Sequence, residues 1–185
     1  MAIILSVKES KMKRIIAIFF CVFLIGVAIF FGASSTQNNH KEYLRIHIRA
    51  NSNSSLDQNV KYQIKDKVVE YLTPIISSCT TKQDFEDALQ KNLIHIECIA
   101  NEILAQNTFD YKSQALLKNE YFPARSYNEF TLESGYYDAL IVNLGSGKGD
   151  NWWCVVYPPL CFINSSSNYV YKSRLVQIIK NFFGG

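Results

Sequence analysis

The chain has 185 residues, 14% of them aromatic, with only 8 Gly and 4 Pro, a composition typical of an ordered fold and not of a flexible stalk. Its formal net charge is +3, but residues 1–34 hold four Lys or Arg and one acidic residue, so the remaining residues carry 15 charges of each sign. This balance excludes a nucleic-acid-binding protein, which would need a basic surface.

The chain opens with an export signal. Four basic residues between positions 8 and 14 precede an unbroken apolar run, Ile15–Phe31, and small residues follow up to Ser35, an order typical of a secretory signal peptide. At about 17 residues the run also reaches the lower limit for a membrane-spanning helix. Residues 1–35 are therefore either a cleaved signal peptide or an N-terminal membrane anchor. Both alternatives export the rest of the chain, because the basic flank stays in the cytoplasm.

A polar spacer, residues 36–42, leads into a segment of strict alternation that predicts a strand over residues 43–50. On such a strand the apolar side chains share one face and the basic ones share the other. We expect the first set to face the core and the second to face outward: Leu44, Ile46 and Ile48 against Arg45, His47 and Arg49.

Two amphipathic helices are expected next, because apolar residues recur at steps of three and four. The first covers residues 55–72 and is stopped by Pro74. The second covers residues 80–105. Each is expected to open with a capping box, formed by Ser55 with Gln58 and by Thr80 with Gln83.

Beyond residue 111 the apolar period changes to two, which predicts strands. The last two of these strands, expected over residues 136–144 and 152–157, flank a Gly-rich segment, residues 145–151. They are expected to pair as a hairpin. The expected fold class is α+β: a strand, two helices, then antiparallel strands forming one sheet with the helices packed on one face, and a short C-terminal helix. The three strands are residues 113–121, 136–144 and 152–157. Residues 43–163 form a single globular domain, and residues 164–185 are a Ser/Asn linker and a C-terminal amphipathic helix.

The cysteines outside the apolar run allow disulfides in an exported domain. Cys154 and Cys161 enclose a short Pro-containing loop, and we expect them to form a bridge. Cys79 and Cys98 are either a second pair or unpaired, since Cys98 has apolar neighbours and is equally plausible as a small core residue.

Adjacent tryptophans, Trp152 and Trp153, must point to opposite faces of their strand. Pro158 and Pro159 then end the strand in a rigid turn. A rigid aromatic loop of this kind is a good interface anchor, because little entropy is lost on binding. The alternative is a stapled turn that only holds the sheet together.

The sequence contains no G-x-S-x-G motif, and its three histidines lack the spacing of metal ligands. We therefore expect no catalytic nucleophile, no metal and no cofactor. Paired carboxylates of a glycoside hydrolase would be distant in sequence, so a secreted cell-wall hydrolase or wall-binding module is kept as the alternative function. The candidate carboxylates are Asp57, Asp66, Glu133 and Asp138.

The segment Asn151–Phe162, N-W-W-C-V-V-Y-P-P-L-C-F, resembles the stage II sporulation protein R family. Further matching segments are Gly135–Leu140, Phe122–Tyr127, Ile48–Ser52 and Asp57–Asp66. The chain departs from the family pattern at residues 53–56, which are less acidic, and at Glu133-Ser134, where Pro-Ala is expected.

The resemblance implies an exported signalling protein that is made in the forespore and acts in the space between forespore and mother cell, either free or tethered to a membrane. Its implied partner is a membrane-embedded peptidase of the mother cell, which processes the precursor of sporulation sigma factor E. The protein itself would be no enzyme, and its only membrane contact would be the N-terminal segment. The residues expected to bind the partner are Asn51, Asp57, Arg125, Tyr127, Trp152, Trp153, Pro158 and Pro159, around the Cys154–Cys161 bridge.

Overall fold

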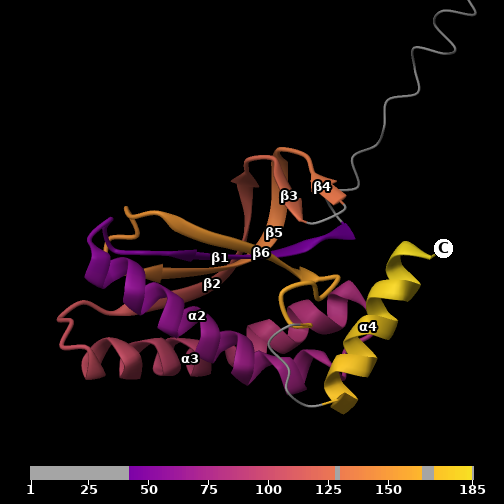
Figure 1. Ribbon diagram of the computed structural model, residues 1–185, viewed down its shortest axis with the longest axis horizontal. Helices are drawn as coiled ribbons and strands as arrows, with labels where there is room; N and C mark the ends of the chain where they lie inside the picture. The colour runs from indigo at the N-terminus through magenta and orange to yellow at the C-terminus, as the bar shows by residue number, and fades with distance from the viewer. Residues whose placement is uncertain (1–41, 128–129, 164–168, 185) are drawn as a thin grey trace, which may run out of the picture. The chain divides into compact units, whose positions relative to one another are not determined.

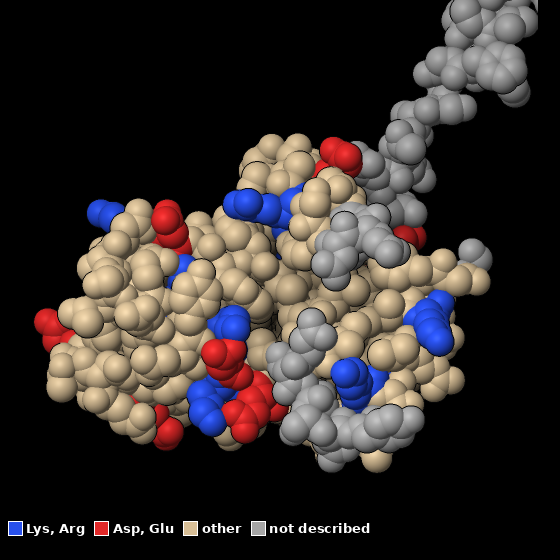
Figure 2. Space-filling model, viewed as in Figure 1, with Lys and Arg blue, Asp and Glu red and all other residues tan. Residues whose placement is uncertain are grey.

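The computed structural model describes residues 42–127, 130–163 and 169–184. They belong to one compact unit, Asn39–Gly185. The predicted signal or anchor, residues 1–35, lies outside the described residues. None of the helices in the described ranges is both long and apolar enough to span a membrane. Charged side chains of both signs are scattered over the face seen in Figure 2, in keeping with the balanced charge of this part of the chain.

The fold class is α+β, as predicted. A four-stranded sheet has the order β2-β5-β1-β6, and two long helices lie on one side of it (Figure 1). A separate two-stranded hairpin lies on the other side of the sheet. The elements in chain order are β1 (Leu44–Arg49), α2 (Ser55–Ile76), α3 (Lys82–Gln106), β2 (Ser113–Phe122), β3 (Arg125–Tyr127), β4 (Phe130–Leu132), β5 (Gly135–Leu144), β6 (Asn151–Tyr157) and α4 (Tyr169–Phe183).

The predicted hairpin of β5 and β6 is wrong, because β1 lies between them. β1 pairs with β5 in parallel and with β6 in antiparallel orientation, so the sheet is mixed. The loop after β5 therefore crosses the end of β1. At Gly149 this loop donates its N–H to Ala50 O over 2.8 Å. A Cβ at Gly149 would lie 2.2 Å from Ser52 O, so the crossing requires glycine.

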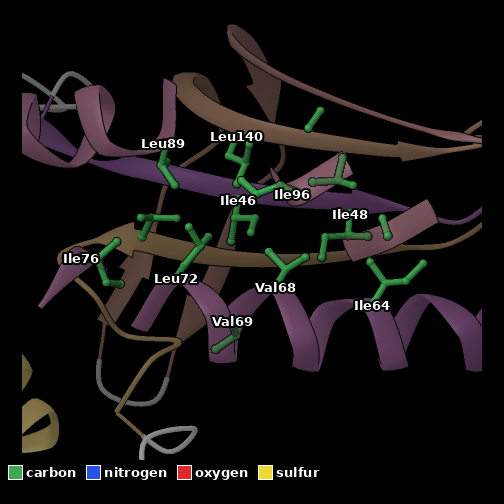
Figure 3. Close-up of a cluster of buried hydrophobic side chains, with 14 of the residues drawn as sticks. Ile46, Ile48, Ile64, Val68, Val69, Leu72, Ile76, Leu89, Ile96 and Leu140 are labelled. Atoms are coloured by element: carbon green, nitrogen blue, oxygen red, sulfur yellow. The ribbon is translucent and has the colours of Figure 1, made fainter. Parts of the chain in front are cut away.

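The core lies between the sheet and helices α2 and α3. Figure 3 shows Ile64, Val68 and Leu72 of α2 directed toward Ile46 and Ile48 of β1. All five side chains are completely buried. The four-residue steps along α2 thus place one apolar stripe against the apolar face of the central strand.

The helix ends differ by small shifts from those predicted. The N-cap of α2 is Ser54, whose side chain accepts the N–H of Asp57. The capping box of α3 joins Thr81 and Asp84. Asp84 prevails because its carboxylate accepts hydrogen bonds from both Thr80 N and Thr81 N, at 3.0 and 2.9 Å, and a charged acceptor binds N–H groups more strongly than an amide oxygen.

Pro74 does not stop α2, which continues to Ile76. Proline removes the hydrogen bond to the carbonyl of Glu70 and crowds this carbonyl. Glu70 is exposed, so water can replace the missing donor. The last turn is also stabilised by side chains: Thr73 Oγ1 donates to Val69 O at 2.6 Å, and Ser77 Oγ donates to Pro74 O at 2.8 Å.

The outward orientation predicted for the basic residues of β1 is wrong for Arg45 and His47, which are 0% and 1% exposed. The alternation assigned them to the correct face of the sheet, opposite the helices. That second face is itself covered by a smaller apolar cluster, in which Phe122, Leu132 and Tyr137 are buried. We call it the second core.

We expect Ile46→Ala to lower the free energy of unfolding by about 2 to 5 kcal/mol, because it leaves a cavity at the centre of the sheet. Chemical denaturation followed by circular dichroism measures this change. Leu56→Ala, at a side chain that is 68% exposed, is the control and should change the free energy by less than about 0.5 kcal/mol. Equal effects of the two substitutions would contradict the assignment of the core.

Candidate functional site

Arg45 occupies the middle of the second core without a carboxylate partner among the described residues. Its Nη2 donates to the hydroxyl of Tyr127 over 2.7 Å. Its guanidinium carbon lies 4.3 Å from the ring centre of Phe122 and 4.9 Å from that of Tyr137. Nε and Nη1 have no hydrogen-bond partner within the described ranges. Burial lowers the pKa of Arg45, and the π faces of the rings take the place of water around the cation.

Trp153 lies over the same cluster and remains partly accessible. Its ring stacks on His47, with 3.8 Å between ring centres and 19° between planes. The ring of Phe122 also packs against the indole in an edge-to-face contact, with 5.0 Å between ring centres. The indole is therefore fixed by buried neighbours and presents only part of its surface.

Arg125 joins this indole from the short strand β3. Its guanidinium carbon lies 5.6 Å from the ring centre of Trp153, and the residue is exposed. Tyr127, two residues later, is half-buried and bound to Arg45. Three of the predicted partner-binding residues thus come together, and we call Arg125, Tyr127 and Trp153 the Trp153 surface.

His47 is neutral beneath the indole. Burial, followed by the nearby charge of Arg49, lowers the pKa of His47 to about 3. Glu120 Oε1 lies 3.8 Å from His47 Nδ1, but the same carboxylate forms an ion pair with Arg49. A neutral imidazole stacks on Trp153 without adding a second buried cation next to Arg45.

Asn51 and Asp57 lie elsewhere, just beyond the carboxyl end of β1. Asp57 is 5% exposed and accepts hydrogen bonds from Asn51 Nδ2 at 3.2 Å, from Ser52 Oγ at 2.5 Å and from the Tyr111 hydroxyl. Burial alone would raise the pKa of Asp57, but these hydrogen bonds outweigh it and hold the pKa below its usual value. Asn51 Oδ1 accepts the N–H of Ser146 at 2.9 Å. These two residues therefore tie the loops that cross the end of β1.

The remaining predicted residues flank the disulfide. Trp152 packs against the helix-side core, with Lys65 Nζ 5.8 Å from its ring centre, so the two tryptophans point to opposite faces, as predicted. Pro158 and Pro159 are buried and support the loop from within.

The predicted Cys154–Cys161 bridge is present, with 6.1 Å between the Cα atoms. Its loop also covers the outer edge of β6, because Val155 N–H points to Cys161 Sγ at 3.1 Å. Cys79, which is buried, and Cys98, which is exposed, are both free thiols.

Two of the carboxylates considered for hydrolysis, Asp57 and Asp138, are too far apart to act as a catalytic pair. Asp138 pairs with Leu44 at the start of β1 and forms an ion pair with Lys82 at 2.5 Å. Asp57 lies beyond the other end of this six-residue strand, a separation of roughly 20 Å, whereas glycosidase carboxyl groups are about 5 to 10 Å apart. No group of three or more His, Cys, Asp or Glu that could hold a metal occurs among the described residues.

Sequence reasoning missed Arg45, Phe122 and Tyr137 as supports of the Trp153 surface. Alternation shows which side chains share a face, and it does not show whether that face is covered. The available signal was the density of aromatic residues between positions 121 and 137, which supplies enough apolar surface for a second core.

The known proteins to which this chain is similar are sporulation proteins. A family model described as stage II sporulation protein R matches residues 40–167. The stage II sporulation protein R of Bacillus subtilis (strain 168) is 28% identical over 173 residues, which cover 88% of this chain and 77% of that protein. No solved structure matches this chain.

The buried His47 predicts a loss of stability in weak acid. In the unfolded chain this histidine binds a proton below about pH 6.5, whereas in the folded chain it stays neutral down to about pH 3. The free energy of unfolding should therefore fall by about 2 to 3 kcal/mol between pH 6.5 and 4.5 through His47 alone. In His47→Phe, which keeps an aromatic ring in the stack, this part of the loss should disappear.

Urea denaturation at several pH values measures the effect, with His95→Phe as the control because His95 is exposed. The range above pH 4.5 avoids most carboxylate titration. Parallel pH profiles for wild type and His47→Phe would show that His47 is not held neutral by burial.

The disulfide closes a loop with a sequence separation of 7, for which the loss of chain entropy in the unfolded state is worth about 2 to 3 kcal/mol. Cys154→Ser and Cys161→Ser should each lower stability by this amount under oxidising conditions. Cys98→Ser, at an exposed free thiol, should have no such effect. If mass spectrometry of the oxidised protein shows both cysteines alkylated, the bridge is absent.

Proposed function

The chain belongs to the stage II sporulation protein R family, and on this premise we propose that it is an exported signal that activates a membrane-embedded peptidase. That peptidase processes the precursor of sporulation sigma factor E in the mother cell. The protein is exported from the forespore and acts in the space between the two cells. The observation that carries the proposal is the family match across most of the domain, residues 40–167.

The protein acts by binding and not by catalysis. A ligand changes the activity of its receptor only if it binds the active state more tightly than the inactive one. A surface that is rigid before binding favours such an interaction, because little binding energy is lost in ordering side chains. The signal and the peptidase then couple two compartments without any transfer of the signal protein into the mother cell.

The Trp153 surface is the contact that we assign to the peptidase. Tryptophan, tyrosine and arginine are the residues that most often dominate binding energy at interfaces, and all three types meet here. The indole is fixed by His47 and Phe122 at 3.8 and 5.0 Å between ring centres, and Arg125 is exposed above it. Asn51 and Asp57 support this role indirectly, by shaping the loops just beyond the carboxyl end of β1.

Co-expression of this chain, the peptidase and the sigma factor precursor in a non-sporulating host tests the proposal. The precursor should be processed only when this chain is present. Equal processing with and without it would overturn the signalling function. Release of peptidoglycan fragments by the purified domain would instead favour the cell-wall hydrolase.

In the same assay, Arg125→Glu should reduce processing strongly, because it replaces a positive charge of the Trp153 surface by a negative one. Residue 125 is exposed, so the substitution should leave the second core intact. Trp153→Ala should weaken activation by about 30-fold or more if the indole is a binding hot spot. Lys91→Glu, an equal charge change on the exposed side of α3, is the matched control. Full activation by both Arg125→Glu and Trp153→Ala would exclude this surface as the contact.

A further inference from the structure

The terminal helix α4, Tyr169–Phe183, differs from the rest of the domain in its charge. It contains Lys172, Arg174 and Lys180 and no acidic residue, whereas the domain as a whole is balanced. All three basic residues are exposed, and basic side chains lie on the visible surface of α4 in Figure 2. The positive charge of this helix is therefore not neutralised by acidic residues on the same element.

Two apolar stripes run along α4. The first packs on the domain and comprises Tyr171, Leu175, Ile178 and Phe182, at steps of four, three and four. Leu175 is completely buried. The ring of Phe182 is in edge contact with Tyr43 and with Tyr157, each at 5.4 Å between centres. This stripe fixes the orientation of the helix on the domain.

The second stripe does not coincide with the first. It comprises Lys172, Val176, Ile179, Lys180 and Phe183, in which each residue has another member three or four positions away. It lies next to the packed stripe on the helix surface. Val176 and Ile179 are half-buried, and Phe183 is 48% exposed. Lys172, Val176 and Lys180 also line a shallow hollow. We call these five residues the outer stripe.

We propose that the outer stripe binds the surface of an anionic phospholipid bilayer. Helices that lie in the interface combine partly exposed large apolar residues with a lysine- or arginine-rich flank, and the outer stripe has both. The lysines would contact phosphate groups while the apolar side chains enter the boundary of the acyl chains. A carboxylate on the helix would oppose this binding, and α4 has none.

The position of α4 agrees with this occupant. The chain enters the described domain at Tyr43, whose ring contacts Phe182 of α4. The end of α4 is thus next to the point where the chain arrives from the predicted signal or anchor. Membrane contact, expected from the sequence only through the N-terminal segment, then has a second element in the folded domain itself. The inference does not depend on the activation of a peptidase.

Vesicle sedimentation tests the proposal with the compact unit Asn39–Gly185, which excludes the apolar run and has its own core. The probes are large unilamellar vesicles of phosphatidylglycerol and of phosphatidylcholine. We expect binding to the anionic vesicles only, weakened by added salt. No binding of the wild-type unit to phosphatidylglycerol would overturn the proposal.

Lys172→Glu/Lys180→Glu should lower the partition coefficient by more than about 25-fold, since each lysine near an anionic surface contributes about fivefold. Lys91→Glu/Lys112→Glu is the matched control, with the same change of net charge at exposed positions outside α4. If both double variants lose binding equally, net charge and not the outer stripe is responsible, and the proposal fails.

A second pair of variants tests the contribution of the apolar side chains of the outer stripe. Phe183→Ser should weaken binding several-fold, whereas Val170→Ser should not, because Val170 is 62% exposed but lies outside the outer stripe. Two results together would overturn the membrane assignment: the wild-type unit binds neither kind of vesicle, and the α4 charge variant abolishes processing of the sigma factor precursor. The outer stripe would then bind a protein partner.

Discussion

Arg45 is a cation with no exposed surface, and the second face of the sheet is organised around it. Removing a guanidinium from water without a carboxylate partner costs several kcal/mol. The attraction between the cation and a desolvated aromatic face stabilises it by about 2 kcal/mol or more. Here the rings come from separate strands, Phe122 at the end of β2 and Tyr137 in β5. The Tyr127 hydroxyl adds a hydrogen bond from β3. Because Tyr127 lies on β3, its hydrogen bond to Arg45 ties the β3–β4 hairpin to the sheet.

The Trp153 surface follows from this arrangement. Trp153 lies beside Arg45 on the same face and stacks on His47, which is neutral because it is buried among basic residues. The disulfide holds the loop after β6 against the outer edge of that strand. The indole and Arg125 are thus presented by a rigid base, whereas an equivalent pair on a free loop would lose entropy on binding.

Local patterns predicted most of the elements, since strands and helices follow from apolar periods of two and of three to four. The bridge between Cys154 and Cys161 followed from their spacing around the prolines. The position of β1 between β5 and β6 could not be predicted in this way. Hairpin rules concern neighbours in sequence, and β1 is roughly a hundred residues from the strands that it separates. The burial of Arg45 also depends on distant residues. Asn51 and Asp57 were expected at the partner interface, but their hydrogen bonds show that they also hold the loops at the end of β1.

The central claim is that the second face, and not the helical face, meets the peptidase. A photo-reactive amino acid placed at position 125 or at position 94 of the full chain, co-expressed with the peptidase, tests it directly. Arg125 and Ile94 are both exposed, Ile94 at 73% on α3, so either probe leaves the fold intact. We predict a cross-link to the peptidase from position 125 and none from position 94. A cross-link from position 94 with none from position 125 would contradict the account.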